Sequence, residues 1–184
     1  MSDSRDCSAL VEVNCETDFV SRSDEFRAFA EPLAGIALGI GEDCDDINIL
    51  NALSFDDSGK TVEEMRLEVL SKIRENITVS RVVVFKASEG AIVGSYVHRE
   101  RLGIMVEITG GAGSEIADDL AVHVAVKKPQ WLDVDDIPAQ TIAKERDIYL
   151  KQARGSGKPD HILDRIVDGK IGKFSKDYTL VNQP

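Results

Sequence analysis

The segment Thr17-Asp18-Phe19-Val20 places a carboxylate beside a phenyl ring in a stretch that predicts a loop. Adjacent side chains of an extended loop point in different directions, so both Asp18 and Phe19 can reach a binding partner. A projecting phenylalanine can insert between two helices, and its burial contributes about 1.5–3 kcal/mol. The residues alone leave a second interpretation open, in which Phe19 packs on the local core and Asp18 caps the next helix.

Covalent chemistry by a cysteine would require Cys15 together with a histidine base, and the chain has His98, His123 and His161. No nucleophile elbow surrounds Cys15, so we interpret it as a small apolar residue at the end of a strand. His98 lies near a predicted hairpin turn, where it either contacts a partner or is solvated. His123 lies on an apolar helix, and this position predicts that its side chain is packed.

Acidic residues are frequent, but their spacing does not predict a metal site. Asp24, Glu25 and the stretch 42–57 are rich in carboxylates without the spacing of an EF-hand. The chain also has no phosphate-binding loop, no GxGxxG motif and no basic aromatic patch. The sequence therefore predicts no cofactor, metal or nucleotide site in this chain, and it does not predict an enzyme.

The 184 residues are 42% hydrophobic, which is enough to bury the cores of one or two small domains. The net charge of −11 disfavours direct binding to nucleic acid, and it suits a basic protein partner or only solubility. Cys7, Cys15 and Cys44 lack CxxC spacing, which predicts neither a disulfide framework nor a closed zinc site. No apolar run predicts a membrane span, and residues 1–6 lack the pattern of a signal peptide.

Apolar periodicity predicts strands and helices in a core over 1–136 and a helical hairpin over 137–184. The expected elements begin with a strand over 9–13, a loop over 14–23, and a helix capped by Asp24 and interrupted or restarted at Pro32. A surface connection over 42–60 then leads to a helix with a capping box at Thr61 and Glu64, a strand over 77–85, and a hairpin over 92–98 and 101–109. The last elements are a helix from Ser114, with Ile116, Leu120, Val124 and Val126 inward, and helices over 138–153 and 159–174 joined by 155–157. The apolar stripes of the last two helices are narrow, which predicts a protruding pair.

A weak internal repeat indicates a duplicated unit of strand, loop and helix. Residues 10–13 resemble residues 105–108, and residues 29–34 resemble residues 116–121. The first unit has the longer loop, and its extra residues lie within 14–23. Because a duplicated scaffold does not need this extension for its own packing, we expect function there.

Residues 10–20 closely resemble the signature of the elongation factor Ts family. Further segments resemble that family in the family's own order: Lys72-Ile73-Arg74-Glu75-Asn76-Ile77, Gly94-Ser95-Tyr96-Val97-His98, Leu102-Gly103-Ile104-Met105-Val106-Glu107, Ala121-Val122-His123-Val124-Ala125, Lys128-Pro129, Gly157-Lys158-Pro159 and Leu180-Val181-Asn182-Gln183-Pro184. Arg74 departs from the pattern, since the family usually has glycine at that position. The resemblance covers nearly all of residues 9–184.

The resemblance implies an α+β core of two related subdomains, each a small antiparallel sheet beside helices, with a projecting helical hairpin. It implies a guanine nucleotide exchange factor of translation elongation, whose partner is the GDP-bound form of elongation factor Tu. The Asp18-Phe19 pair would push between helices of the partner's GTPase domain, disturb its magnesium and phosphate contacts and release GDP. The partner-facing residues implied are Thr17, Asp18, Phe19, Val20, Ile73, Arg74 and His98.

Two further expectations follow from the resemblance. The family's N-terminal helical module and its closing C-terminal strands have no counterpart, so we expect a central region with a truncated hairpin. Such a region can instead be an adaptor that binds elongation factor Tu without exchanging nucleotide. The family acts in the bacterial cytoplasm or, alternatively, in the mitochondrial matrix or plastid stroma.

Overall fold

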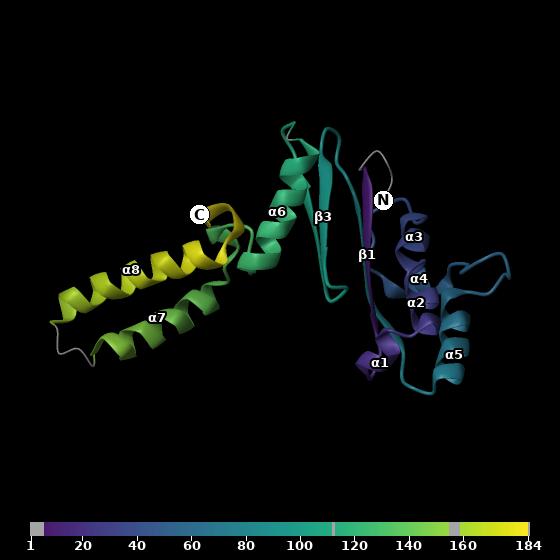
Figure 1. Ribbon diagram of the computed structural model, residues 1–184. Helices are drawn as coiled ribbons and strands as arrows, with labels where there is room; N and C mark the ends of the chain where they lie inside the picture. Colours follow the sequence, from purple (N-terminus) through teal and green to yellow (C-terminus); the bar gives the residue numbers. More distant parts are fainter. Residues whose placement is uncertain (1–5, 112, 155–158, 184) are drawn as a thin grey trace. The chain divides into compact units, whose positions relative to one another are not determined.

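The computed structural model describes residues 6–111, 113–154 and 159–183 (Figure 1). The chain divides into two compact units, Met1–Ala125 and Val126–Pro184. Helices and two small antiparallel sheets place the chain in the predicted α+β class. The first unit carries both sheets, and the second is helical.

The first sheet pairs β1 (Cys7–Asn14) with β2 (Thr78–Lys86) in antiparallel register, with Val11 opposite Val82. Side chains alternate between the two faces of a strand. The alternate residues of β1 that pack against the helical core are Cys7, Ala9, Val11 and Val13. The predicted strand over 9–13 is therefore confirmed, and its alternation defines which face the helices cover.

Four helices build the main core on that face of the sheet (Figure 1). They are α2 (Asp24–Ala30), α3 (Leu33–Leu38), α4 (Ile47–Ala52) and α5 (Val62–Ile73). The largest side chains that are completely buried in this core are Phe29, Leu33, Leu50, Ile77, Val62, Val82 and Val84.

Helix boundaries in this unit follow local capping. The predicted box at the start of α5 is confirmed, because Thr61 Oγ1 accepts from the Glu64 N–H at 3.2 Å and Glu64 Oε2 accepts from the Thr61 N–H at 2.8 Å. Pro32 separates α2 from α3, since proline cannot continue the hydrogen-bond pattern of a helix. Helix α3 ends before Gly39.

Two predictions about these helices are wrong. Ser23 rather than Asp24 caps α2, since Ser23 Oγ accepts a hydrogen bond from the Phe26 N–H at 3.3 Å. Residues 42–60 are not only a surface connection, because they contain α4. Asp46 caps α4 by accepting from the Asn48 N–H at 2.9 Å, and full burial of Leu50 anchors the helix to the core.

The second sheet is the predicted hairpin of β3 (Ile92–His98) and β4 (Leu102–Ile108). Its turn is closed by a hydrogen bond of 3.0 Å from the Arg101 N–H to the His98 carbonyl. A Cβ atom on Gly103 would lie 2.9 Å from Leu10 Cδ2. The hairpin therefore packs on the face of β1 opposite the helices, as Figure 1 shows.

Helix α6 (Ser114–Lys127) lies against the outer face of this hairpin, but not through the side chains that the sequence predicts. Ala117 and Ala121 are buried, whereas Ile116 is 58% exposed and Val126 is 70% exposed. Leu120 and Val124 are half-buried. The reason is the close approach of the helix backbone to Gly94, which leaves room only for small side chains between them.

The second unit contains α7 (Ala139–Arg154) and α8 (Asp160–Tyr178), which pack together, with short 3-10 turns η1 (Val134–Asp136) and η2 (Leu180–Asn182). Ala153, Leu163 and Val167 form its buried core. Trp131 makes a bridge to Thr179 and a ring contact with Phe174. The predicted connection at 155–157 lies outside the described residues.

Two exposed glycines within α8 give the first testable prediction. A Cβ on Gly169 or Gly172 meets nothing within 4 Å, so alanine removes backbone freedom from the unfolded chain without a clash. We expect each change to stabilise the protein by about 0.5–1 kcal/mol. Thermal unfolding followed by circular dichroism measures it. Gly59→Ala is the matched control: its site is equally open, but its φ of 78° disfavours alanine. A lower melting temperature for Gly169→Ala would contradict the account.

Candidate partner-binding site

Residues 18–21 form a short helix, α1 (Asp18–Ser21), where the sequence predicts a loop. Thr17 has extended backbone angles and caps the helix, because its Oγ1 accepts a hydrogen bond from the Val20 N–H at 3.3 Å. The Thr17 carbonyl accepts from the Ser21 N–H at 3.2 Å. Threonine is a favoured N-cap residue, and the acidic Asp18 in the first turn also suits the start of a helix.

Phe19 points out of α1 and is 84% exposed. The interpretation in which Phe19 folds onto the core is therefore wrong. Asp18 does not cap α2 either, since its carboxylate pairs with Arg22 of the same turn at 3.3 Å. Val20 is half-buried against the main core and fixes the turn to the unit. The packing of α1 thus leaves the phenyl ring of Phe19 in solvent.

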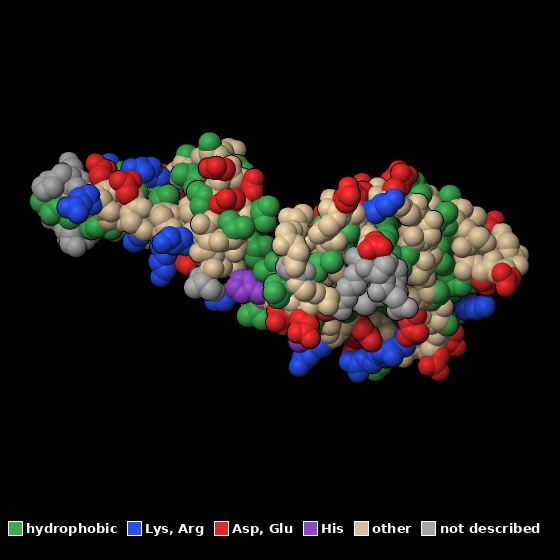
Figure 2. Space-filling model, turned by 90° about the horizontal axis from the view of Figure 1, so that it is seen from above, with side chains coloured by type: hydrophobic (Ala, Val, Ile, Leu, Met, Phe, Trp, Pro, Cys, Tyr) green, Lys and Arg blue, Asp and Glu red, His purple; other side chains and the backbone are tan. Residues whose placement is uncertain are grey.

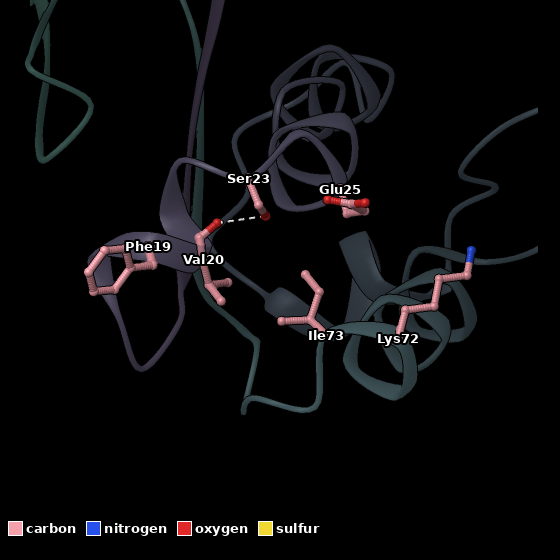
Figure 3. A pocket seen from close by; sticks show the side chains of 6 residues that line it. All are labelled: Phe19, Val20, Ser23, Glu25, Lys72 and Ile73. Atoms are coloured by element: carbon pink, nitrogen blue, oxygen red, sulfur yellow. Dashed lines mark hydrogen bonds between the residues drawn. The ribbon is translucent and has the colours of Figure 1, made fainter.

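A hollow of about 520 Å³ lies between α1 and the C-terminal end of α5. Its lining side chains are Phe19, Val20, Ser23, Glu25, Lys72 and Ile73. Figure 3 shows the ring of Phe19 at one edge, pointing away from the others, with Val20 between it and Ile73. The structure thus brings Phe19, Val20 and Ile73, which are predicted from distant parts of the sequence, to one place.

Arg74 ends α5 in a left-handed conformation, with φ 63° and ψ 26°. Its N–H donates to the Leu70 carbonyl at 2.8 Å, which completes the C-terminal cap. Left-handed backbone favours glycine and costs other residues about 1–2 kcal/mol. This strain gives a physical reason for the glycine that the resembling family usually has here.

Arg74→Gly is expected to stabilise the chain by about 1 kcal/mol, because glycine adopts this conformation without strain. Arg74→Ala is the matched control, since it removes the same charged side chain and keeps the strain. Urea unfolding of the two variants and the parent measures the difference. Equal stabilities for the glycine and alanine variants would show that the conformation of residue 74 carries no strain.

His98 is exposed at the end of β3, and its Nδ1 lies 2.9 Å from the Tyr96 hydroxyl. It does not line the hollow. The turn that follows it is tied to α2 by an ion pair of 3.3 Å between Glu100 and Arg27. Figure 1 shows this turn and α1 at the same end of the first unit. His98 therefore lies toward the end that displays Phe19.

Glu75 is a residue that the sequence patterns do not single out. Its carboxylate accepts hydrogen bonds from the N–H and the hydroxyl of Thr17. The two residues are 58 positions apart, so no local pattern could reveal the contact. The signal available in the sequence is that Glu75 lies within the family-resembling segment Lys72-Ile73-Arg74-Glu75-Asn76-Ile77.

The cysteines show no sign of nucleophilic activation. Burial, and secondarily the negative charge of Glu75, raises the pKa of the Cys15 thiol. Cys15 Sγ donates to the Thr17 carbonyl at 3.3 Å, and the thiol stays protonated at neutral pH. A raised pKa is the opposite of what a thiolate nucleophile requires. The interpretation of Cys15 as a packed residue agrees with its place beside the main core.

Charges and metal-ligating groups do not define another site in the described parts of the chain. Among residues 6–111, 113–154 and 159–183, no group of three His, Cys, Asp or Glu side chains could hold a metal ion. On the face seen in Figure 2, Asp and Glu are interspersed with Lys and Arg. No helix within these same residues has the length and apolar character needed to cross a membrane.

An exposed aromatic side chain beside a partly apolar hollow is typical of a surface that docks another protein. The first unit is thus an α+β module that displays an exposed aromatic side chain beside a hollow. The chain belongs to the elongation factor Ts family, since the model of the family described as "Elongation factor TS" matches residues 16–184.

Curated relatives agree with this family. The chain is 41% identical over 184 residues to an elongation factor Ts of Methylococcus capsulatus, covering 100% of this chain and 61% of the relative. It is 44% identical over 176 residues to those of Burkholderia mallei and Burkholderia pseudomallei, covering 96% of this chain and 58% of each relative. The chain therefore spans about three fifths of the length of these relatives.

Proposed function

We propose that this chain promotes GDP release from elongation factor Tu by inserting Phe19 between helices of the partner's GTPase domain. The observation that carries the proposal is the 84% exposure of Phe19 on a turn that is capped and held to the core. Insertion moves the ring from water into an apolar environment. That transfer contributes about 1.5–3 kcal/mol, which is available to deform the partner.

The residues around Phe19 either contact the partner or hold the turn that carries Phe19. Asp18 offers a carboxylate that competes for hydrogen-bond donors of the partner, and within the described part of the chain this carboxylate forms an exposed ion pair with Arg22. Thr17 and Val20 hold the turn to the unit. The half-exposed Ile73 beside the hollow gives a partner helix an apolar surface to contact. Arg74 follows it in the chain, and the turn after His98 lies at the same end of the unit as α1.

Thermodynamic linkage explains how the chain releases a nucleotide that it does not touch. If the chain binds nucleotide-free partner more tightly than GDP-bound partner, GDP and the chain weaken each other's binding by one shared factor. Phe19 needs only to fit the deformed conformation better than the GDP-bound one. No covalent bond forms or breaks, and the magnesium ion in this scheme belongs to the partner.

The architecture implied by the family is part of the same proposal. The core over 1–136 comprises two related subdomains, and residues 137–184 form a projecting helical hairpin that adds contact area. The relatives are bacterial proteins, and the proposed site of action is the cytoplasm.

Isothermal titration of the chain against nucleotide-free and GDP-loaded elongation factor Tu tests this linkage. We expect binding to the nucleotide-free form to be at least about tenfold tighter, equivalent to a coupling of about 1.4 kcal/mol. A complex of equal affinity with both forms would instead favour the adaptor function.

A further inference from the structure

Glu75 connects the end of α5 to the turn that carries Phe19. One carboxylate oxygen, Oε2, accepts the Thr17 N–H at 3.1 Å, and the other, Oε1, accepts the Thr17 hydroxyl at 2.9 Å. Hydrogen bonds to an ionised carboxylate are stronger than those between neutral groups. Glu75 therefore holds Thr17 by both its backbone and its side chain.

A second contact runs in the opposite direction between the same two segments. Glu16 Oε1 accepts a hydrogen bond from the Asn76 N–H at 3.3 Å. Each segment thus donates a backbone N–H to a carboxylate on the other. Arg74, in its left-handed conformation, turns the chain out of α5 immediately before this contact.

The bond to Glu75 also determines what the Thr17 hydroxyl can do. A hydroxyl has one proton to donate and two lone pairs with which to accept. Because its proton is directed to Glu75, its oxygen is left to accept the Val20 N–H and cap α1. A helix of four residues is too short to be stable without such anchoring.

We propose that Glu75 is a positioning residue for Phe19: by clamping Thr17 it holds α1 in the form that presents the phenyl ring to the partner. This inference deepens the proposed function and rests on it. Glu75 does not line the hollow and acts through Thr17. Without the Glu75 carboxylate, the turn that carries Phe19 is less ordered in the free chain. The turn must then become ordered on binding, and this entropic cost weakens the insertion of Phe19.

The first arm of the test uses the chain alone and measures amide hydrogen exchange at Val20 by NMR. Glu75→Ala is expected to speed exchange at Val20 on the order of tenfold, since a charge-assisted clamp and the cap are lost together. Glu75→Gln retains one acceptor oxygen and should give a smaller increase. Exchange at the β1 and β2 amides should stay unchanged, which separates local loosening of α1 from global unfolding.

The second arm measures GDP release from elongation factor Tu with the same variants. Glu75→Ala should slow release on the order of tenfold, but it should have no further effect when combined with Phe19→Ala. Glu68→Gln, on the exposed side of α5 in an ion pair with Lys60, is the matched control and should match the parent.

The outcomes separate the two claims. Unchanged Val20 exchange in Glu75→Ala overturns the positioning role, whatever the release assay shows. Release by Glu75→Ala at the parent rate, where Phe19→Ala fails, also overturns it, as does an additive effect of the two changes. If the parent chain itself does not speed release, the proposed function fails, while Val20 exchange still decides whether Glu75 holds the turn.

Discussion

Phe19→Ala is expected to reduce the acceleration of GDP release from elongation factor Tu by about 10- to 100-fold. The burial of a phenyl ring is worth about 1.5–3 kcal/mol, and each 1.4 kcal/mol corresponds to a factor of ten. The loss should appear in the release rate because the ring acts on the deformed conformation of the partner. Stopped-flow measurement of fluorescent GDP leaving the partner gives the rate directly.

The fold of the Phe19→Ala variant should be unaffected, since a side chain that is 84% exposed contributes little to packing. Its free energy of unfolding should lie within about 0.5 kcal/mol of the parent. Leu67→Ala is the matched control, because Leu67 is a large apolar side chain, 49% exposed, on α5. A Leu67→Ala variant as defective as Phe19→Ala would show that general surface hydrophobicity, not the position of Phe19, drives release.

Gly94→Ala is expected to give the largest loss of stability. A Cβ at this position would lie 2.2 Å from the Ala117 carbonyl carbon and 2.3 Å from its oxygen. These are backbone atoms of α6, so the helix itself must move, and the hydrogen bond of 3.1 Å from the Ser95 N–H to Asp118 is strained with it. We expect destabilisation by about 3 kcal/mol or more, at the upper end for overpacked sites.

Thermal unfolding of Gly94→Ala should show a melting temperature lower by roughly 6–12 °C, given about 2–4 °C per kcal/mol for a chain of this size. Gly35→Ala is the matched control in the same unit. A Cβ on Gly35 meets nothing within 4 Å, and its position within α3 favours alanine. A Gly94→Ala variant as stable as Gly35→Ala would mean that α6 does not pack on β3 as closely as described.

The strands were predictable because their signal is local. Alternation over 9–13 and the β-branched runs over 77–85 and 92–98 predict strands, which the structure has at Cys7–Asn14, Thr78–Lys86 and Ile92–His98. The capping box of Thr61 and Glu64 was equally predictable, since both partners lie within one helical turn.

Elements that depend on distant packing were not predictable. Helix α4 lies in an acidic stretch, and its anchor is the fit of Leu50 into a core assembled from other elements. Helix α6 turns Ala117 and Ala121 inward because Gly94 on a separate strand permits close approach, so Ile116 and Val126 stay exposed. Apolar periodicity predicts which face of a helix is apolar, but the surface on which the helix packs within the unit determines which of its residues are buried.

In the candidate site, too, local features were predictable from the sequence and long-range contacts were not. The residues left open whether Phe19 is packed or exposed, because exposure depends on how the turn is held. Thr17 holds it locally as a cap, which its residue type predicts, and Glu75 holds it from 58 positions away, which no local pattern predicts. The role of Phe19 at a partner surface, which the family resemblance implies, is a proposal for experiment.

The most direct measurement is the rate constant for GDP release from elongation factor Tu as a function of the concentration of the parent chain. The account predicts a rate that rises with concentration to a plateau well above the intrinsic release rate, and that stays near the intrinsic rate with Phe19→Ala. A release rate that does not change while the parent chain demonstrably binds the partner would contradict the central claim that Phe19 drives nucleotide release.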